Sequence, residues 1–215
     1  MKYIFLFGHR QQHGKDTCCD ILTTKLQEKN ITFKKSFFAK LLKKQVAERY
    51  NLNYDLMETN DYKQWCPPHI NKKRVALEDG TTKEIPRTVR DILIEEGCKG
   101  RDIWDNTWAN SAYMEILQSK TEIGIISDYR YENEYKSFST SFDAFQQENG
   151  KIERPIPIRV LVHRPKGVFK NDGADNELPD VDPIAWDYTI INEESKKWKE
   201  NLEAQINNML LNYGV

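Results

Sequence analysis

The sequence contains few cysteines and no long hydrophobic run. Its four cysteines have no metal-ligand spacing, and two of them are neighbours on a predicted helix, where they could not usefully crosslink the fold. We therefore expect reduced thiols at Cys18, Cys19, Cys66 and Cys98. The N-terminal apolar run is too short for a signal peptide, and no later stretch approaches the roughly 20 apolar residues of a membrane span. These absences predict a cytoplasmic protein.

Neither sign of charge is in excess. Lys and Arg total 32 and Asp and Glu total 33, for a net charge of -1. We therefore expect no general attraction to nucleic acid or to a membrane, and any phosphate binding must come from locally placed Lys and Arg side chains. The chain also lacks internal repeats and low-complexity tracts. Its 215 residues suffice for one domain with a sizeable core, and we expect a single domain over residues 1–215.

Strand and helix patterns alternate along the chain. Strand patterns cover residues 2–7, 31–38, 122–128, 156–165 and 186–192. Helical patterns cover residues 14–28, 40–50, 87–97, 104–118 and 131–148, and the inner stripe of a closing helix is formed by Leu202, Ile206, Met209 and Leu210. Strands joined by helices predict an α/β fold with a mostly parallel sheet flanked by helices. Ligands of such sheets bind beyond the carboxyl ends of the strands.

Two segments interrupt this alternation. Residues from about 60 to 86 contain Pro67-Pro68 and short apolar runs on either side of Asp79-Gly80. This pattern predicts a small hairpin insertion that turns at the Asp-Gly pair. Residues from about 164 to 183 are rich in glycine and charge and have no period, which predicts a surface loop of the length that lids have.

The stretch FGHRQQHGKDT, residues 7–17, joins the first predicted strand to the first predicted helix. Such a junction aims backbone N–H groups and a helix N-terminus at one anionic point. A lysine at a helix start is unfavourable beside the helix dipole unless an anion lies nearby, so Lys15 favours phosphate binding over an ordinary solvated lysine. The stretch departs from a standard phosphate loop, because five residues separate Gly8 from Gly14 and Asp16 stands where Ser or Thr is usual.

Asp16 and Thr17 extend this motif into the first turn of the helix. Both residue types are favoured there as helix caps, which is the plainer interpretation. A carboxylate beside bound phosphates, however, requires an intervening cation, and Mg²⁺ takes hard oxygen ligands directly or through water. We therefore expect Mg²⁺ near Asp16 or Thr17 if a nucleotide binds.

Six stretches together resemble the deoxynucleoside monophosphate kinases of large DNA bacteriophages. They occur in order along nearly the whole chain: GKDT (14–17), FAKLLKKQVA (38–47), TVRDILIEEG (88–97), ISDYRYENE (126–134), VLVHRP (160–165) and DYTIINEES (187–195). The resemblance implies a single P-loop kinase domain of the P-loop NTPase type, located in the host-cell cytoplasm if the protein is viral. It also implies transfer of the γ-phosphoryl group of ATP, with Mg²⁺, to a nucleoside 5′-monophosphate.

Phosphoryl transfer of this kind depends on positioning and charge stabilisation. The attacking phosphate oxygen is already anionic near pH 7, so no strong general base is needed. The resemblance assigns Arg90 and Lys43 to the acceptor phosphate. The alternatives are a solvated arginine on a helix face for Arg90 and an exposed basic helix face for Lys43. Arg101 is a weaker acceptor-site candidate. Trp104, four residues before Trp108 on one predicted helix, could stack the acceptor base, although core packing is expected for at least one of the two.

The remaining candidates follow the ends of predicted strands. Asp128 ends a strand and is expected to bind the acceptor or to orient metal-bound water. Arg130 is expected to stabilise charge on the transferring group, with a surface ion pair to Glu132 or Glu134 as the alternative. Arg164, just before a proline at the mouth of the predicted lid, is expected to clamp ATP on closure, with an ordinary loop arginine as the alternative. The ATP-binding set is completed by His13, Gly14, Lys15, Asp16 and Thr17, and none of the histidines is expected to bind a metal.

Two other functions stay open from the sequence. The chain could be a kinase of another small phosphorylated acceptor, such as phosphomevalonate, or a nucleotide-binding module without transfer activity. The sequence does not give the base preference, the discrimination against ribose, or the oligomeric state, for which a homodimer is one option. It also does not show how the lengthened segment from Gly8 to Gly14 wraps the phosphates.

Overall fold

The computed structural model describes residues 1–8, 13–77, 80–165, 186–193 and 195–215. The chain forms two compact units. Unit 1 comprises Met1–Phe38 and Ala109–Val215, and unit 2 comprises Ala39–Trp108. Residues 166–183 of the predicted lid lie outside the described residues, and so does Asp79 of the predicted turn. The expectation of a single domain over residues 1–215 stays a prediction.

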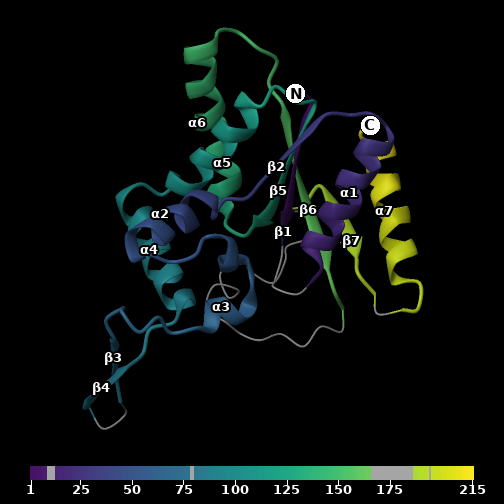
Figure 1. Ribbon diagram of the computed structural model, residues 1–215. Helices are drawn as coiled ribbons and strands as arrows, with labels where there is room; N and C mark the ends of the chain where they lie inside the picture. The colour runs from purple at the N-terminus through teal and green to yellow at the C-terminus, as the bar shows by residue number, and fades with distance from the viewer. Residues whose placement is uncertain (9–12, 78–79, 166–185, 194) are drawn as a thin grey trace. The chain divides into compact units, whose positions relative to one another are not determined.

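Unit 1 contains a parallel five-stranded sheet (Figure 1). The strand order is β2 (Phe33–Ser36), β5 (Ile123–Tyr129), β1 (Tyr3–Gly8), β6 (Ile156–His163) and β7 (Tyr188–Ile191). Each neighbouring pair runs in parallel, so the carboxyl ends of all five strands meet at one edge. The predicted α/β fold with a mostly parallel sheet is confirmed, and β1, which leads into the candidate phosphate loop, is the central strand.

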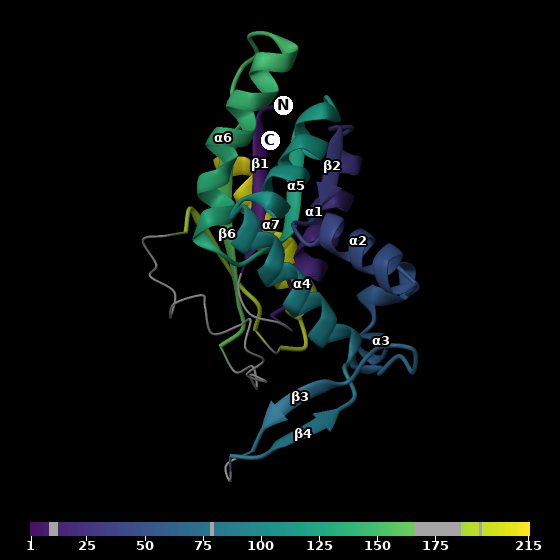
Figure 2. The same ribbon diagram turned by 90° about the vertical axis from the view of Figure 1, so that its left-hand side faces the viewer.

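Helices cover both faces of this sheet (Figures 1 and 2). One face packs against α1 (Lys15–Glu28) and α7 (Trp198–Asn212), and the other against α5 (Thr107–Gln118) and α6 (Glu132–Asn149). Alternate residues of β1 enter the two cores: Phe5 and Phe7 pack with α1 and α7, whereas Ile4 and Leu6 pack with α5 and α6. A strand buried on both faces is hydrophobic throughout, which explains the continuous apolar run at the N-terminus.

The predicted inner stripe of α7 is confirmed. The predicted stripe of α7 is fully buried at Leu202, Ile206, Met209 and Leu210. Cys18 and Cys19 lie in the same core, where burial raises the pKa of the Cys18 thiol to about 12 and that of Cys19 well above its usual range. None of the four cysteines is in a disulfide, as predicted. No helix in the described ranges has both the length and the apolarity to cross a membrane.

Unit 2 is a small helical core with a hairpin. It contains α2 (Lys40–Tyr50), the short 3₁₀ helix η1 (Asp55–Glu58), α3 (Asn60–Gln64), β3 (Lys73–Ala76), β4 (Thr82–Ile85) and α4 (Val89–Ile103). Its core is formed by Leu42, Val46, Ala47, Met57, Val89, Ile92 and Trp108. β3 and β4 pair in antiparallel register, with Ala76 opposite Thr82, which confirms the predicted hairpin (Figure 2). The hairpin is joined to α4 by an ion pair between Lys73 Nζ and Asp91 Oδ1 over 2.6 Å.

The helix predicted over residues 87–97 continues to Ile103 as α4. Two glycines near its end allow it to pack closely: a Cβ on Gly100 would collide with the Trp108 ring, and one on Gly97 would lie 3.1 Å from a Leu42 methyl. Trp104 then ends α4 in an extended conformation, and Trp108 belongs to the next helix. The prediction that the two tryptophans share one helix is therefore wrong, because tertiary packing at the glycines outweighs their low helix propensity.

Candidate functional site

The start of α1 requires a glycine. Gly14 caps the helix in the left-handed conformation, with φ 94° and ψ 20°, and its carbonyl accepts the first helical hydrogen bond from Cys18 N over 2.9 Å. This conformation disfavours any residue with a Cβ. A Cβ at this position would also collide with the side-chain amide of Asn192. The Gly-Lys pair thus has the strand–loop–helix setting of a P-loop.

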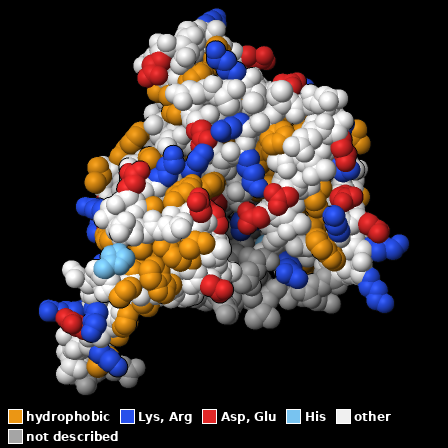
Figure 3. Space-filling model, viewed as in Figure 1, with side chains coloured by type: hydrophobic (Ala, Val, Ile, Leu, Met, Phe, Trp, Pro, Cys, Tyr) orange, Lys and Arg blue, Asp and Glu red, His pale blue; other side chains and the backbone are white. Residues whose placement is uncertain are grey.

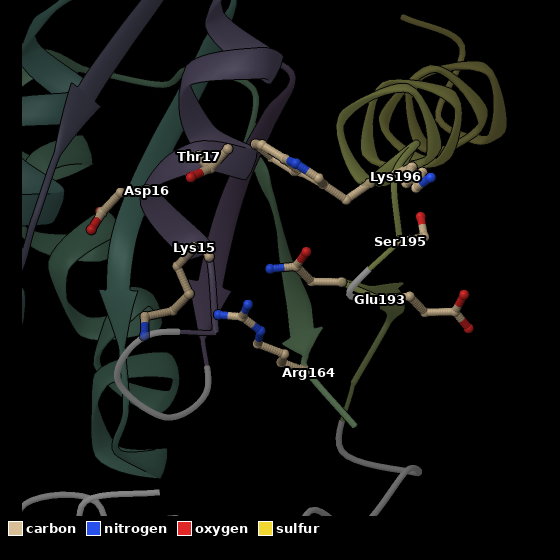
Figure 4. A pocket seen from close by; sticks show the side chains of 10 residues that line it. Lys15, Asp16, Thr17, Arg164, Glu193, Ser195 and Lys196 are labelled. Atoms are coloured by element: carbon tan, nitrogen blue, oxygen red, sulfur yellow. The ribbon is translucent and has the colours of Figure 1, made fainter. Parts of the chain in front are cut away.

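A pocket of about 660 Å³ opens at the carboxyl ends of the central strands, beside the N-terminus of α1 (Figure 4). Four parts of unit 1 line it: the start of α1, the end of β6, the connection from β7 to α7, and the start of α7. The lining residues are Gly14, Lys15, Asp16, Thr17, Arg164, Asn192, Glu193, Ser195, Lys196 and Trp198. Five of the predicted ATP-binding residues are thereby brought together from positions about 150 residues apart, namely Gly14 to Thr17 and Arg164.

The cations that line this pocket are Lys15, Arg164 and Lys196, and its carboxylates are Asp16 and Glu193. Lys15 is only 8% exposed, and its side chain and that of Arg164 both line the pocket next to the helix start (Figure 4). The carboxylate of Glu193 points away from both. Because the helix N-terminus adds partial positive charge at the same point, the pocket is suited to bind an anion.

The predicted magnesium residues, Asp16 and Thr17, both line the pocket. Asp16 is exposed, and in Figure 4 its carboxylate lies on the opposite side of the helix start from Arg164. Within the described part of the chain, no group of three or more His, Cys, Asp and Glu side chains is arranged to hold a metal. Mg²⁺ in nucleotide sites is typically held by one or two protein oxygens together with water and phosphate, and Asp16 and Thr17 fit that donor set.

His13, predicted to bind ATP, is held by the fold. It is 1% exposed, its ring Nδ1 accepts a hydrogen bond from Arg164 N over 3.1 Å, and its carbonyl accepts one from Asn192 Nδ2 over 2.8 Å. Asn192 was not a sequence candidate. Its partner lies 179 positions away, and nothing in the sequence near Asn192 signals that contact.

Asp128 and Arg130 are at the end of β5, as predicted. Asp128 Oδ1 accepts a hydrogen bond from Phe38 N over 2.7 Å. The backbone N–H groups of Arg130 and Tyr131 both donate to Glu134 Oε2, over 2.7 and 3.0 Å. Burial, together with the nearby negative charge of Asp128, raises the pKa of Glu134 to about 8. The contact of Glu134 with Arg130 thus involves the Arg130 main chain, and Glu132 pairs with Lys136 over 2.8 Å.

Four of the predicted acceptor residues belong to unit 2, namely Lys43, Arg90, Arg101 and Trp104, whereas Asp128 and Arg130 belong to unit 1. Lys43 is 9% exposed and donates to both carboxylate oxygens of Glu58, over 2.7 and 2.8 Å, so the alternative of an exposed basic face is wrong. Arg90 lies in the first turn of α4, and Arg101 Nη2 donates to Cys98 Sγ over 3.4 Å.

The two tryptophans differ in exposure. Trp108 is buried, with its indole N–H bonded to Gly97 O over 3.0 Å, whereas Trp104 is 47% exposed. Core packing is thus confirmed for Trp108, and Trp104 retains an accessible aromatic face. Hydrophobic side chains gather on unit 2 between α3 and the hairpin (Figure 3). The large exposed hydrophobic residues of unit 2 are Leu56, Trp65, Val75, Leu77, Ile94, Ile103 and Trp104.

Comparisons with known proteins leave the family open. No protein-family model matches the chain, and no curated protein matches it. Among solved structures, a plasmid partition protein of Borrelia burgdorferi B31 bound to AMPPNP is 12% identical, with 99% of each chain covered and a TM-score of 0.34. At this score the two backbones differ over much of their length, and no function follows from the likeness. The resemblance to bacteriophage kinases stays a prediction.

Proposed function

We propose that the protein is an ATP-dependent kinase that phosphorylates deoxynucleoside 5′-monophosphates to the diphosphates. The observation that carries the proposal is the convergence of Lys15, Arg164 and the N-terminus of α1 on one pocket at the carboxyl edge of a parallel sheet. Two cations and a helix N-terminus favour a multiply charged anion, and the triphosphate of ATP is such a ligand.

In this proposal the groups of unit 1 act on the phosphoryl donor. The N–H groups at the start of α1 and the Lys15 ammonium bind the β- and γ-phosphates, and Arg164 binds the triphosphate from the end of β6. Mg²⁺ near Asp16 or Thr17 would bridge phosphate oxygens and neutralise charge that develops during transfer. Arg130 stabilises the transferring group, and Asp128 orients the acceptor or metal-bound water.

The acceptor phosphate is assigned to Arg90 and Lys43 of unit 2 by the resemblance alone. Arg90 is proposed to bind its phosphate through the two parallel N–H groups of the guanidinium, with Lys43 and Arg101 as additional cations. The Lys43–Glu58 ion pair is an obstacle to a direct role for Lys43, because phosphate would have to displace or share with a carboxylate. The exposed face of Trp104 is proposed to stack the base.

A coupled ADP-release assay tests the proposal. The full-length chain is incubated with ATP, Mg²⁺ and, in turn, each deoxynucleoside and ribonucleoside monophosphate, with phosphomevalonate as an acceptor of different chemistry. Turnover with one or more nucleoside monophosphates is expected. Turnover with phosphomevalonate alone would place the protein in another kinase class, and ATP binding without turnover on any acceptor would indicate a non-catalytic nucleotide-binding module.

A further inference from the structure

The residue before Gly14 is held at two points. The His13 ring accepts a hydrogen bond from the main-chain N–H of Arg164, and the His13 carbonyl accepts one from the Asn192 side chain. Because a main-chain N–H can only donate, Nδ1 of His13 must offer its lone pair, and the proton of the neutral ring is on Nε2. A carbonyl can only accept, so the Asn192 contact is made by its amide NH₂ group.

Both donors come from well-anchored strand ends. Arg164 directly follows β6, and Asn192 directly follows β7. The two strands pair in parallel up to His163 and Ile191, and Asn192 N extends the ladder by donating to His163 O over 2.7 Å. His13, the residue before Gly14, is therefore tied to the ends of two adjacent strands.

The Asn192 contact determines the orientation of the peptide that leads into the helix. In a planar trans peptide the carbonyl and the N–H point in opposite directions. Holding the His13 carbonyl against Asn192 therefore fixes the direction of the Gly14 N–H. The amide of Asn192 also occupies the space that a Cβ on Gly14 would need, so the same side chain explains why residue 14 is glycine.

We propose that His13 and Asn192 are positioning residues for phosphate binding, because they hold the Gly14 peptide and the Arg164 backbone in the arrangement that binds the anion. This inference rests on the proposed function only in taking the pocket as a phosphate site. It assigns a role to His13, which is buried and bonded to residues at the ends of two strands. The ordering cost of this residue is thereby met before the ligand arrives.

Binding measurements with the full-length chain test the role of Asn192. Calorimetric titrations with ATP and with inorganic tripolyphosphate are compared for the wild type, Asn192→Ala and Asn192→Asp. The matched control is Asn149→Asp, which removes an amide donor to a backbone carbonyl (Phe145 O, 2.9 Å) at the end of α6. We expect Asn192→Ala to weaken both ligands by about ten- to a hundredfold, as misplacement of binding groups does. Asn149→Asp should leave both affinities unchanged.

Comparing ATP with tripolyphosphate, and Asn192→Ala with Asn192→Asp, separates a positioning role of Asn192 from an effect of added charge. We expect the binding of ATP and that of tripolyphosphate to weaken equally. His13 and Asn192 orient groups that bind phosphate and not groups that contact the base. An Asn192→Ala protein that binds both ligands within about twofold of wild type would overturn the inference, even if Asn192→Asp is impaired, because only the added charge would then matter. A wild type that binds tripolyphosphate but transfers no phosphate would overturn the proposed kinase activity and leave the Asn192 comparison decisive. A wild type that binds neither ligand would overturn both.

Rescue by a conservative variant tests His13. Asn can present its side-chain oxygen near the position of Nδ1, whereas Leu fills similar space without an acceptor. We therefore expect His13→Asn to retain most of the tripolyphosphate affinity and His13→Leu to lose it, at equal thermal stability or after correction for unfolding. Equal affinities of the two variants would show that the ring merely fills space.

Discussion

The main-chain N–H of Phe38 donates a hydrogen bond to Oδ1 of Asp128 over 2.7 Å, linking the residues that follow β2 to β5. Asp128 thus has a structural contact in addition to its proposed role in catalysis. An asparagine can still accept from Phe38 but carries no charge, whereas an alanine leaves a buried N–H without an acceptor.

The two substitutions of Asp128 should therefore have different effects. Asp128→Asn is expected to unfold at nearly the wild-type temperature and to lose at least about tenfold in kcat, the order expected when one charged group is removed from the transition state. Asp128→Ala is expected to lose about 1–3 kcal/mol of stability as well. Thermal unfolding and steady-state kinetics check both. Wild-type kcat in Asp128→Asn would leave Asp128 with the structural role alone.

The buried Glu134 should make stability depend on pH. Its pKa is raised to about 8 by burial and by the Asp128 charge, against an ordinary value of 4.5. The folded state therefore holds a proton that the unfolded state releases. This contribution to stability is complete below about pH 4.5 and is lost as the pH rises towards 8.

Glu134→Gln removes this titration and retains an oxygen for the N–H groups of Arg130 and Tyr131. We expect the unfolding free energy of the wild type to fall relative to that of Glu134→Gln between pH 5 and 8, by up to about 1.4 kcal/mol per pH unit. Urea unfolding at several pH values measures the difference. Parallel curves for the two proteins would mean that Glu134 is ionised in the folded state at neutral pH.

Arg90 and Arg164 should affect different substrates. Arg90→Ala is expected to raise KM for the monophosphate much more than KM for ATP, and Arg164→Ala is expected to do the reverse. Arg154→Ala is the control, since Arg154 packs over Phe138 and Phe142 and is not among the residues that line the pocket. If each change raised both KM values equally, the two assignments would have to be withdrawn.

The hairpin is predicted to select the acceptor base. Arg74 and Glu84 are directly opposite each other, so residues 75–83 can be replaced by an Asn-Gly turn that keeps this pair and the Lys73–Asp91 ion pair. We expect the shortened protein to rank nucleoside monophosphates differently, with an unchanged KM for ATP. An unchanged ranking in a folded variant would make the hairpin a structural or oligomeric feature, and would leave base selection to Trp104.

The parts of the fold that sequence predicted well are those determined by neighbouring residues. The apolar run of β1 and the Gly14-Lys15 junction indicated a buried strand followed by a helix, and the four interior residues of α7 were recognisable from their spacing. The shared helix of Trp104 and Trp108 was wrong because its end depends on how Gly97 and Gly100 pack, which is a tertiary effect.

The site was predictable to a similar extent. The local Gly14–Thr17 motif placed four pocket residues, and Arg164 joined them through its position just before a proline at the mouth of the predicted lid. The hydrogen bond between Asn192 and His13 was not predictable, because the two residues meet only when β1 and β7 are assembled in one sheet. Glu134 could have been found, since its position three residues after Tyr131 at a helix start is the spacing of a capping box. Its raised pKa depends on burial, which the sequence does not give.

Detection of the labelled product tests the central claim most directly. The wild type and Lys15→Met are incubated with ATP labelled at the γ-phosphate and a panel of deoxynucleoside monophosphates, and the nucleotides are separated by chromatography. The account predicts label in a deoxynucleoside diphosphate for the wild type. It predicts a loss of several hundredfold or more in a folded Lys15→Met protein, which corresponds to roughly 3–4 kcal/mol of charge stabilisation. Label found only in inorganic phosphate, or a Lys15→Met protein that retains more than about a tenth of the rate, would contradict it.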